Sequence, residues 1–164
     1  SKGEAFKWML RSASQGYSLA QARVSHMYLG GEGVPKNPSK SFTWMEKAAL
    51  AGYVEAQGSL GLKYFFGEGV KKDLSQYILW TRLAAQNGSH FAQGSLGLAY
   101  ASGEEGVPEN YSKAYVWMSM SLSQGNEIIR PKFSRLKSLM TQEQIQSGQE
   151  LAGRCFESNY KECD

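Results

Sequence analysis

The chain has 164 residues, of which 41% are hydrophobic, and its 18 basic and 15 acidic side chains leave a net charge of +3. The mean hydropathy is -0.44, and no apolar run approaches the roughly 20 residues that cross a bilayer, so we expect a soluble protein. Because the charge is small and both signs are mixed, nothing in it indicates a nucleic-acid partner or insertion into a membrane.

The sequence repeats with a period of 36 or 37 residues. Four tryptophans and four glycines keep the same intervals: Trp8, Trp44, Trp80 and Trp117, with Gly16, Gly52, Gly88 and Gly125. A period of this length is typical of stacked helical pairs, each buried only by its neighbours. We therefore predict one all-α domain over residues 1–164, with a half repeat (1–16), three full repeats (17–52, 53–88 and 89–125) and a C-terminal cap (126–164).

Residues 1–16 match only the second half of a repeat, because the run around Trp8 aligns with the run around Trp44. A second helix without its first leaves an apolar face uncovered. The chain also starts at Ser1 without a methionine. We expect a processed or trimmed product, with more sequence upstream or another surface over this face.

The repeat 53–88 shows the pattern of each helical pair. Its first helix places Ala56, Leu60 and Tyr64 at intervals of four, which predicts a narrow buried stripe. Gly61 and its counterpart Gly97 should let a neighbouring helix approach closely. A glutamine recurs at the edge of this stripe and should bridge repeats, in a set comprising Gln21, Gln57 and Gln93.

The turn between the two helices needs backbone freedom. Gly67 can take the left-handed conformation that ends a helix, and Gly69 a second special angle. Asn37, Asp73 and Asn110 follow the three turns and are suitable caps for the second helices.

The repeat pattern fades after Gly125. Pro131 can start one helix, and Thr141 with Gln144 has the form of a capping box for another. We predict a terminal cap whose outer side is exposed to solvent. This side carries four basic residues: Arg130, Lys132, Arg135 and Lys137. This basic cluster is either a solvated face or a site for an acidic partner.

A second apolar stripe lies opposite the buried one when each residue turns the helix by about 100°. Its members recur in all three first helices, as Leu19, His26 and Leu29, as Leu62, Phe65 and Phe66, and as Phe91 and Leu98. An apolar stripe open to water is what a peptide or a partner's helix would fill. Part of it, especially Phe65 and Leu29, can instead be core between repeats. Ala22, Gly58 and Gly94 are expected to leave room for a ligand's backbone.

The chain resembles the Sel-1-like repeat family, which is related to tetratricopeptide repeats. The matching residues of the repeat 53–88 are Ala56, Leu60, Gly61, Tyr64, Gly67, Gly69, Val70, Trp80, Ala84, Ala85 and Gly88. Ser25 replaces the first-helix glycine in one copy. The resemblance implies a right-handed α-α superhelix, a solenoid whose first helices line the concave surface, and a role as an adaptor for other proteins.

The two cysteines, Cys155 and Cys163, are separated by seven residues. A disulfide here would stabilise the end of the chain by about 2 to 3 kcal/mol and imply an oxidising compartment. The ending around Asn159 and Tyr160 also resembles exported bacterial members of the family, which favours the periplasm or the cell surface. The alternative is two free thiols in a cytosolic protein.

The sequence shows no motif for catalysis. His26 and His90 lie in different repeats, without metal-ligand spacing or a phosphate-binding loop nearby, so we expect no enzyme activity, cofactor or metal. One glutamate recurs per turn, at Glu32, Glu68 and Glu104. These carboxylates form either an acidic edge for a basic partner or cation, or solvated turns.

We predict a scaffold that binds a partner protein or peptide in its concave groove, through Leu19, His26, Leu62, Phe65, Phe66, Phe91 and Leu98. Some periplasmic members that resemble this chain are immunity proteins that neutralise secreted phospholipase effectors, which is a sharper form of this role. The alternatives are a small-molecule or cell-wall binding enzyme that uses the glutamates or His26, and a structural spacer within a longer array.

Overall fold

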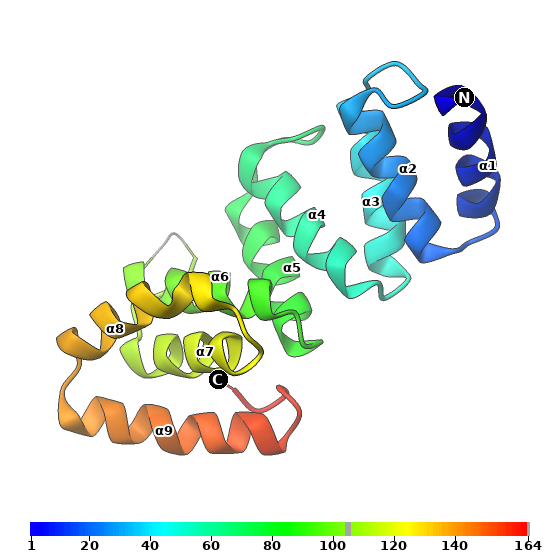
Figure 1. The fold of residues 1–164 in the computed structure, drawn as a ribbon. Coiled ribbons are helices and arrows are strands. Elements are labelled where there is room, and N and C mark those ends of the chain that lie inside the picture. Colours follow the sequence, from blue (N-terminus) through cyan, green and yellow to red (C-terminus); the bar gives the residue numbers. More distant parts are fainter. Residues whose placement is uncertain (104–105, 164) are drawn as a thin grey trace. The chain divides into compact units, whose positions relative to one another are not determined.

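The computed structural model describes residues 1–103 and 106–163, and every regular element in them is a helix. In chain order these elements are α1 (Lys2–Ser14), α2 (Ser18–Gly30), α3 (Pro38–Leu50), α4 (Val54–Phe66), α5 (Leu74–Gln86), α6 (His90–Ser102), α7 (Tyr111–Ser123), the 3-10 helix η1 (Glu127–Ile129), α8 (Arg130–Leu139) and α9 (Gln142–Glu157) (Figure 1). None of the helices in this described part has both the length and the apolar character needed to cross a bilayer. The chain divides into two compact units, Ser1–Trp80 and Thr81–Asp164.

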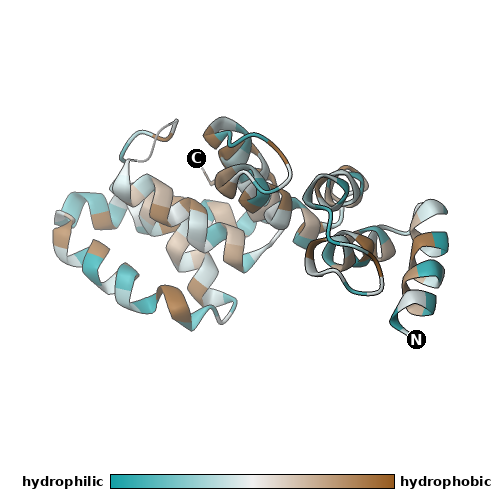
Figure 2. Cartoon of the chain, turned by 90° about the horizontal axis from the view of Figure 1, so that it is seen from above, coloured by the Kyte–Doolittle hydropathy of each residue, from teal (hydrophilic) through white to brown (hydrophobic). Residues whose placement is uncertain are grey.

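In the first unit, helices that follow one another in sequence pack side by side: α1 on α2, α2 on α3, and α3 on α4 (Figure 1). The predicted stripe is buried at Ala56 and Leu60, which are almost inaccessible and contact a cluster with Ala48 and Met45 of α3. Its third member, Tyr64, is half-buried and packs against the same cluster. Small residues at these crossings let the helices approach closely. The half repeat, α1, buries Phe6 and Ala13 against α2. Hydrophobic and hydrophilic residues alternate along α1, the helix at the N-terminus (Figure 2).

Glycines end the first helices as predicted. Gly31, Gly67 and Gly103 all have positive φ, and each closes its helix with a backbone hydrogen bond. Gly69 has a φ of 77°, and a side chain there would collide with the carbonyl group of Pro38 in the preceding repeat. Only glycine satisfies both conditions, so the turn is specified by its sequence.

The predicted caps of the second helices are confirmed. The side chains of Asn37, Asp73 and Asn110 each accept a hydrogen bond from a backbone N–H three residues later, at 2.9, 3.0 and 2.9 Å. Each bond satisfies an amide that the helix itself leaves without a partner.

The recurring glutamines bridge repeats, as expected. Each is buried, and its amide donates to the carbonyl of an alanine eight residues earlier, at the end of the preceding second helix. The pairs are Gln21 with Ala13 at 3.3 Å, Gln57 with Ala49 at 3.4 Å, and Gln93 with Ala85 at 3.1 Å.

In the second unit, α7 packs on α6, on α8 and along α9 (Figure 1). Gly97 allows the close approach of α6 to α7 that the sequence predicts, because an added Cβ would lie 2.7 Å from Met118 Cγ. The indole of Trp117 is fully buried there. The predicted capping box at the start of α9 is present, since Thr141 and Gln144 each bond the other's backbone.

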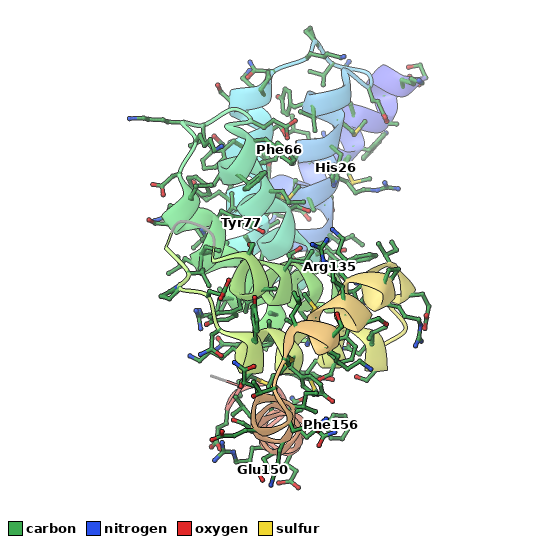
Figure 3. All side chains as sticks on the ribbon, turned by 90° about the vertical axis from the view of Figure 1, so that its left-hand side faces the viewer. His26, Phe66, Tyr77, Arg135, Glu150 and Phe156 are labelled. Atoms are coloured by element: carbon green, nitrogen blue, oxygen red, sulfur yellow. A yellow bond between two sulfur atoms is a disulfide. The ribbon has the colours of Figure 1, made fainter. Side chains whose placement is uncertain are left out.

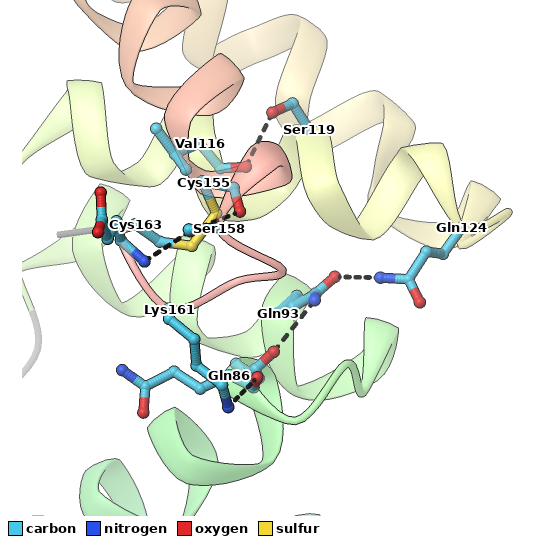
Figure 4. The surroundings of a disulfide bond; sticks show 11 residues. Gln86, Gln93, Val116, Ser119, Gln124, Cys155, Ser158, Lys161 and Cys163 are labelled. Carbon is cyan, nitrogen blue, oxygen red and sulfur yellow. Dashed lines mark hydrogen bonds between the residues drawn. A yellow bond between two sulfur atoms is a disulfide. The ribbon is translucent and has the colours of Figure 1, made fainter.

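The predicted disulfide joins Cys155, in α9, to Cys163, and both residues are buried (Figure 4). The tail between them folds back, as Ser158 Oγ accepts from the backbone N–H of Glu162 at 2.8 Å. Lys161 Nζ then donates to the carbonyl of Gln86 at 2.9 Å, at the end of α5. The tail is therefore held by the disulfide and by the contact of Lys161 with the end of α5.

Candidate binding surface

Four positions recur along the exposed side of the first helices, at spacings of four, three and four residues. On α2 they are Leu19, Arg23, His26 and Gly30, and on α4 they are Glu55, Ser59, Leu62 and Phe66. We call these eight residues the first-helix stripe. Its apolar members are open to water, because Leu19 is 58%, Leu62 48% and Phe66 73% exposed. This spacing places side chains on one helical face.

A hollow of roughly 360 Å³ lies between α2 and α4 within the first unit. Its floor is apolar and buried, with Ala22, Met45 and Ala56. The rim is mostly part of the first-helix stripe, and consists of Leu19, Arg23, His26, Tyr53, Glu55 and Ser59. Since an apolar floor with a few polar groups at the rim is typical of binding pockets, the hollow can accept a side chain of another molecule.

The structure brings Leu19 and His26 together at this hollow, whereas Leu62 and Phe66 continue the same stripe towards the end of α4. His26 and Phe66 are labelled in Figure 3. Phe65 does not belong to this exposed stripe. It is half-buried, and its ring centroid lies 5.0 Å from that of Tyr77 in α5. Phe65 therefore packs between the two helices of its own repeat, whereas the alternative interpretation placed it in core between repeats.

The corresponding positions of α6 lie in the second unit. Phe91 is 62% exposed and its ring lies 4.2 Å from that of His90, while Leu98 is half-buried. The expectation that Gly94 leaves room for a ligand was wrong. Gly94 is buried, and a Cβ there would lie 3.0 Å from the hydroxyl of Ser121 in α7.

A buried lysine beside the stripe was missed by the sequence analysis. Lys63 is 4% exposed, and its Nζ donates to Ser41 Oγ at 2.9 Å and to Glu68 Oε2 at 2.8 Å. Ser25 Oγ of α2 in turn donates to the carbonyl of Ser41 at 2.7 Å. This network joins α2, α3 and α4. One signal was available: the equivalent positions hold an apolar Met27 and Ala99, which indicates a buried site.

The imidazole of His26 lies in a positive environment. Partial burial lowers its pKa, and the charges of Lys63 and Arg23 lower it further, while Glu32 and Glu68 oppose this shift. Both effects disfavour the imidazolium. At neutral pH the hollow therefore presents an uncharged imidazole at its rim, which can donate and accept hydrogen bonds.

The repeated glutamates do not have the same surroundings. Glu68 is 39% exposed and forms the ion pair with Lys63, whereas Glu32 is exposed in its turn. Glu104 lies outside the described residues. Within the residues described, no three His, Cys, Asp or Glu side chains are grouped so that they could hold a metal ion.

The repeats, the turn glycines and the stacked helical pairs agree with a known family. A model described as the Sel1 repeat matches residues 1–17, 18–53, 54–89 and 90–126. The chain belongs to the Sel1 repeat family. Sel1 repeats generally serve as scaffolds for protein–protein interaction, and Sel1 repeat proteins are typically not enzymes.

Two solved structures of this kind are similar to the chain. A Sel1 repeat protein from Oxalobacter formigenes is 33% identical, with a TM-score of 0.73 over 77% of this chain and 95% of that one. A protective antigen of uropathogenic Escherichia coli strains, which displays an SLR fold, is 28% identical with a TM-score of 0.61. That match covers 97% of this chain but only 42% of the antigen. No curated protein matches the sequence. The predicted all-α fold of helical pairs that pack in sequence order is confirmed, and it matches solved repeat solenoids.

Proposed function

We propose that this Sel1 repeat protein binds a segment of a partner protein along the first-helix stripe of its first unit. The observation that carries the proposal is the hollow between α2 and α4, flanked by apolar side chains that remain exposed in the folded chain. The partner segment would place one side chain in the hollow and run past Leu62 and Phe66.

The energetics of the stripe support such a role. Burying a leucine or phenylalanine side chain stabilises a complex by about 1.5 to 3 kcal/mol, so Leu19, Leu62 and Phe66 are suitable anchors. The stripe lies on helices that the folded unit already holds in place, so little ordering opposes binding. Arg23 of α2 and Glu55 of α4 both line the hollow. Their opposite charges would orient the segment that binds between them.

The test compares two double variants in a capture experiment from the envelope fraction of the source organism. Leu62→Asp with Phe66→Asp places charges on the first-helix stripe. Leu50→Asp with Leu79→Asp makes the same change at leucines that are 70% and 57% exposed on second helices. We expect the captured protein to be lost only with the stripe variant. Equal capture by both folded variants, checked by circular dichroism, would contradict the proposal.

We further propose a periplasmic or exported location, which the buried disulfide supports, because such bonds persist in oxidising compartments. A narrower role in that location is neutralising a secreted effector enzyme such as a phospholipase. It predicts a tight complex with one enzyme and loss of that enzyme's activity, with both effects removed by Leu62→Asp and Phe66→Asp. Inhibition that survives these substitutions would place the contact elsewhere.

A further inference from the structure

The positive charge of the chain is concentrated at the start of its C-terminal cap. Residues 127–140 hold four of the 18 basic side chains and one of the 15 acidic ones, so the other 150 residues carry fourteen of each sign. The net charge of +3 therefore resides in this short stretch. Arg130 is neutralised there by Glu127, through two hydrogen bonds between their side chains.

The packing of α8 fixes which of its sides faces solvent. Leu136 is buried, and the half-buried ring of Phe133 lies with its centroid 5.0 Å from that of Tyr115 in α7. Lys137 stays near this side, with its Nζ 5.0 Å from the centre of the Phe133 ring. The side of α8 that flanks Leu136 and carries Lys132 and Leu139 is exposed.

A row of four exposed residues occupies this flanking side, and we call it the α8 stripe. Ile128, Lys132, Arg135 and Leu139 follow one another at spacings of four, three and four residues along η1 and α8. Ile128 is 77% and Leu139 57% exposed, and both cations are exposed as well (Arg135 is labelled in Figure 3). The spacing of Lys132, Arg135 and Leu139 places them on one face of α8, as in a seam between two packed helices, and Ile128 precedes them in η1. The row thus has an apolar residue at each end and two cations between them.

We propose that the α8 stripe binds an acidic helix of a partner protein. The helix would carry two carboxylates at the central seam positions and an apolar residue at each end. Each carboxylate would meet Lys132 or Arg135, while the apolar ends would cover Ile128 and Leu139. Charge complementarity of this kind selects the partner and sets its register.

Other occupants fit the α8 stripe less well. A second copy of the chain docked through the same stripe would place its two cations against Lys132 and Arg135, and like charges repel. A helix that lies on a membrane buries a continuous apolar face and keeps its cations at the edges. Here the cations occupy the middle of the face.

The test uses the full chain and a synthetic peptide of about 15 residues, near the length at which a free helix becomes stable. The peptide carries leucine, glutamate, glutamate and leucine at the spacing of the α8 stripe. Lys132→Glu with Arg135→Glu reverses the stripe. Lys36→Glu with Lys71→Glu makes the same change in net charge on two exposed turns of the first unit. Fluorescence anisotropy reports binding, and circular dichroism confirms that each variant is folded.

We expect the stripe variant to lose roughly 10-fold or more in affinity, as two exposed ion pairs become repulsive. A second peptide with lysines in place of its glutamates should bind this variant and not the wild type. Equal losses in the two variants would overturn the proposal, since net charge alone would then explain binding. So would binding of the wild type to phosphatidylglycerol vesicles but not to the acidic peptide. Because the first-helix stripe is unchanged, the outcome is independent of the function proposed above.

Discussion

Lys63 Nζ lies 2.8 Å from Glu68 Oε2, and this ion pair connects the buried side of α4 to the turn that follows it. The lysine is almost inaccessible, whereas the glutamate is 39% exposed. A buried ammonium needs partners that replace its lost hydration. Glu68 and Ser41 are those partners, so a turn residue supports a helix that carries the first-helix stripe.

Glu68→Gln should lower the free energy of unfolding by about 1 to 3 kcal/mol, because the buried Lys63 would lose its counter-charge. Lys63→Met should recover most of this loss when combined with Glu68→Gln, since the double variant has no buried charge. Urea titrations of the three proteins measure the effect. If Glu68→Gln alone is as stable as the wild type, the ion pair has no structural role.

The stability of the first unit should depend on the protonation of His26. Its pKa is below 6.5, the ordinary value for histidine, so the unfolded chain takes up the proton first as the pH falls. The stability that the neutral imidazole contributes is present above about pH 6.5 and is lost as the pH falls through that value towards the lower pKa of the folded state. His26→Gln should lose less stability between about pH 7 and pH 5.

An NMR titration of His26 gives a second measurement of the same effect. The carboxylate of Glu68 raises the pKa of His26, so Glu68→Gln should lower that pKa further. Glu32→Gln acts in the same direction and serves as an independent check. A pKa of His26 that stays unchanged in both variants would show that the two turn carboxylates do not influence the rim of the hollow.

Two glycine-to-alanine substitutions should have opposite effects. At Gly97, the added methyl group would meet Met118 at 2.7 Å from Cγ and 2.9 Å from the backbone nitrogen, so Gly97→Ala should destabilise by about 1 to 3 kcal/mol. At Gly153 of α9, nothing lies within 4 Å of the added atom. Gly153→Ala should stabilise by about 0.5 to 1 kcal/mol, since alanine favours helix. Thermal melting of both variants measures these effects, as a lower melting temperature for Gly97→Ala and a higher one for Gly153→Ala. Equal shifts of the two melting temperatures would contradict the close approach of helices at Gly97.

Removing the disulfide should release the tail. Cys155→Ser with Cys163→Ser should lower the stability of the oxidised protein by about 2 to 3 kcal/mol, and the contact of Lys161 with Gln86 should be lost. Hydrogen exchange of residues 158–163 reports the release, and a reducing agent should have the same effect on the wild type but none on the variant. Unchanged protection in the variant would mean that Lys161 alone holds the tail.

The local features of the fold could be predicted because each depends on one residue with an uncommon property. Asn37 caps a helix through its own side chain, and Gly67 ends one through its positive φ. The buried stripe of α4 followed from the spacing of Ala56 and Leu60. These features need no knowledge of which helix packs against which.

The features that the sequence analysis missed depend on neighbours that are distant in sequence. A helical wheel gives the direction of Gly94 from its own axis, but it does not say that Ser121 stands there. Phe65 and Phe66 are adjacent and equally apolar, yet Phe65 is half-buried beside the ring of Tyr77 and Phe66 is exposed. The polar contact of Lys63 with Ser41 spans 22 residues, so it became visible only in the folded chain.

The glutamine bridges between repeats have a consequence for synthesis on the ribosome. The last carbonyls of a helix have no partner within that helix. Those of Ala13, Ala49 and Ala85 each accept from the N–H of a turn glycine and, as a second donor, from the amide of a glutamine in the next repeat. Every second helix that emerges from the exit tunnel therefore gains this second donor, and the buried surface that goes with it, only when the next repeat follows. Folding should advance from the N-terminus in steps of one repeat, with the newest helix always the least protected from proteases.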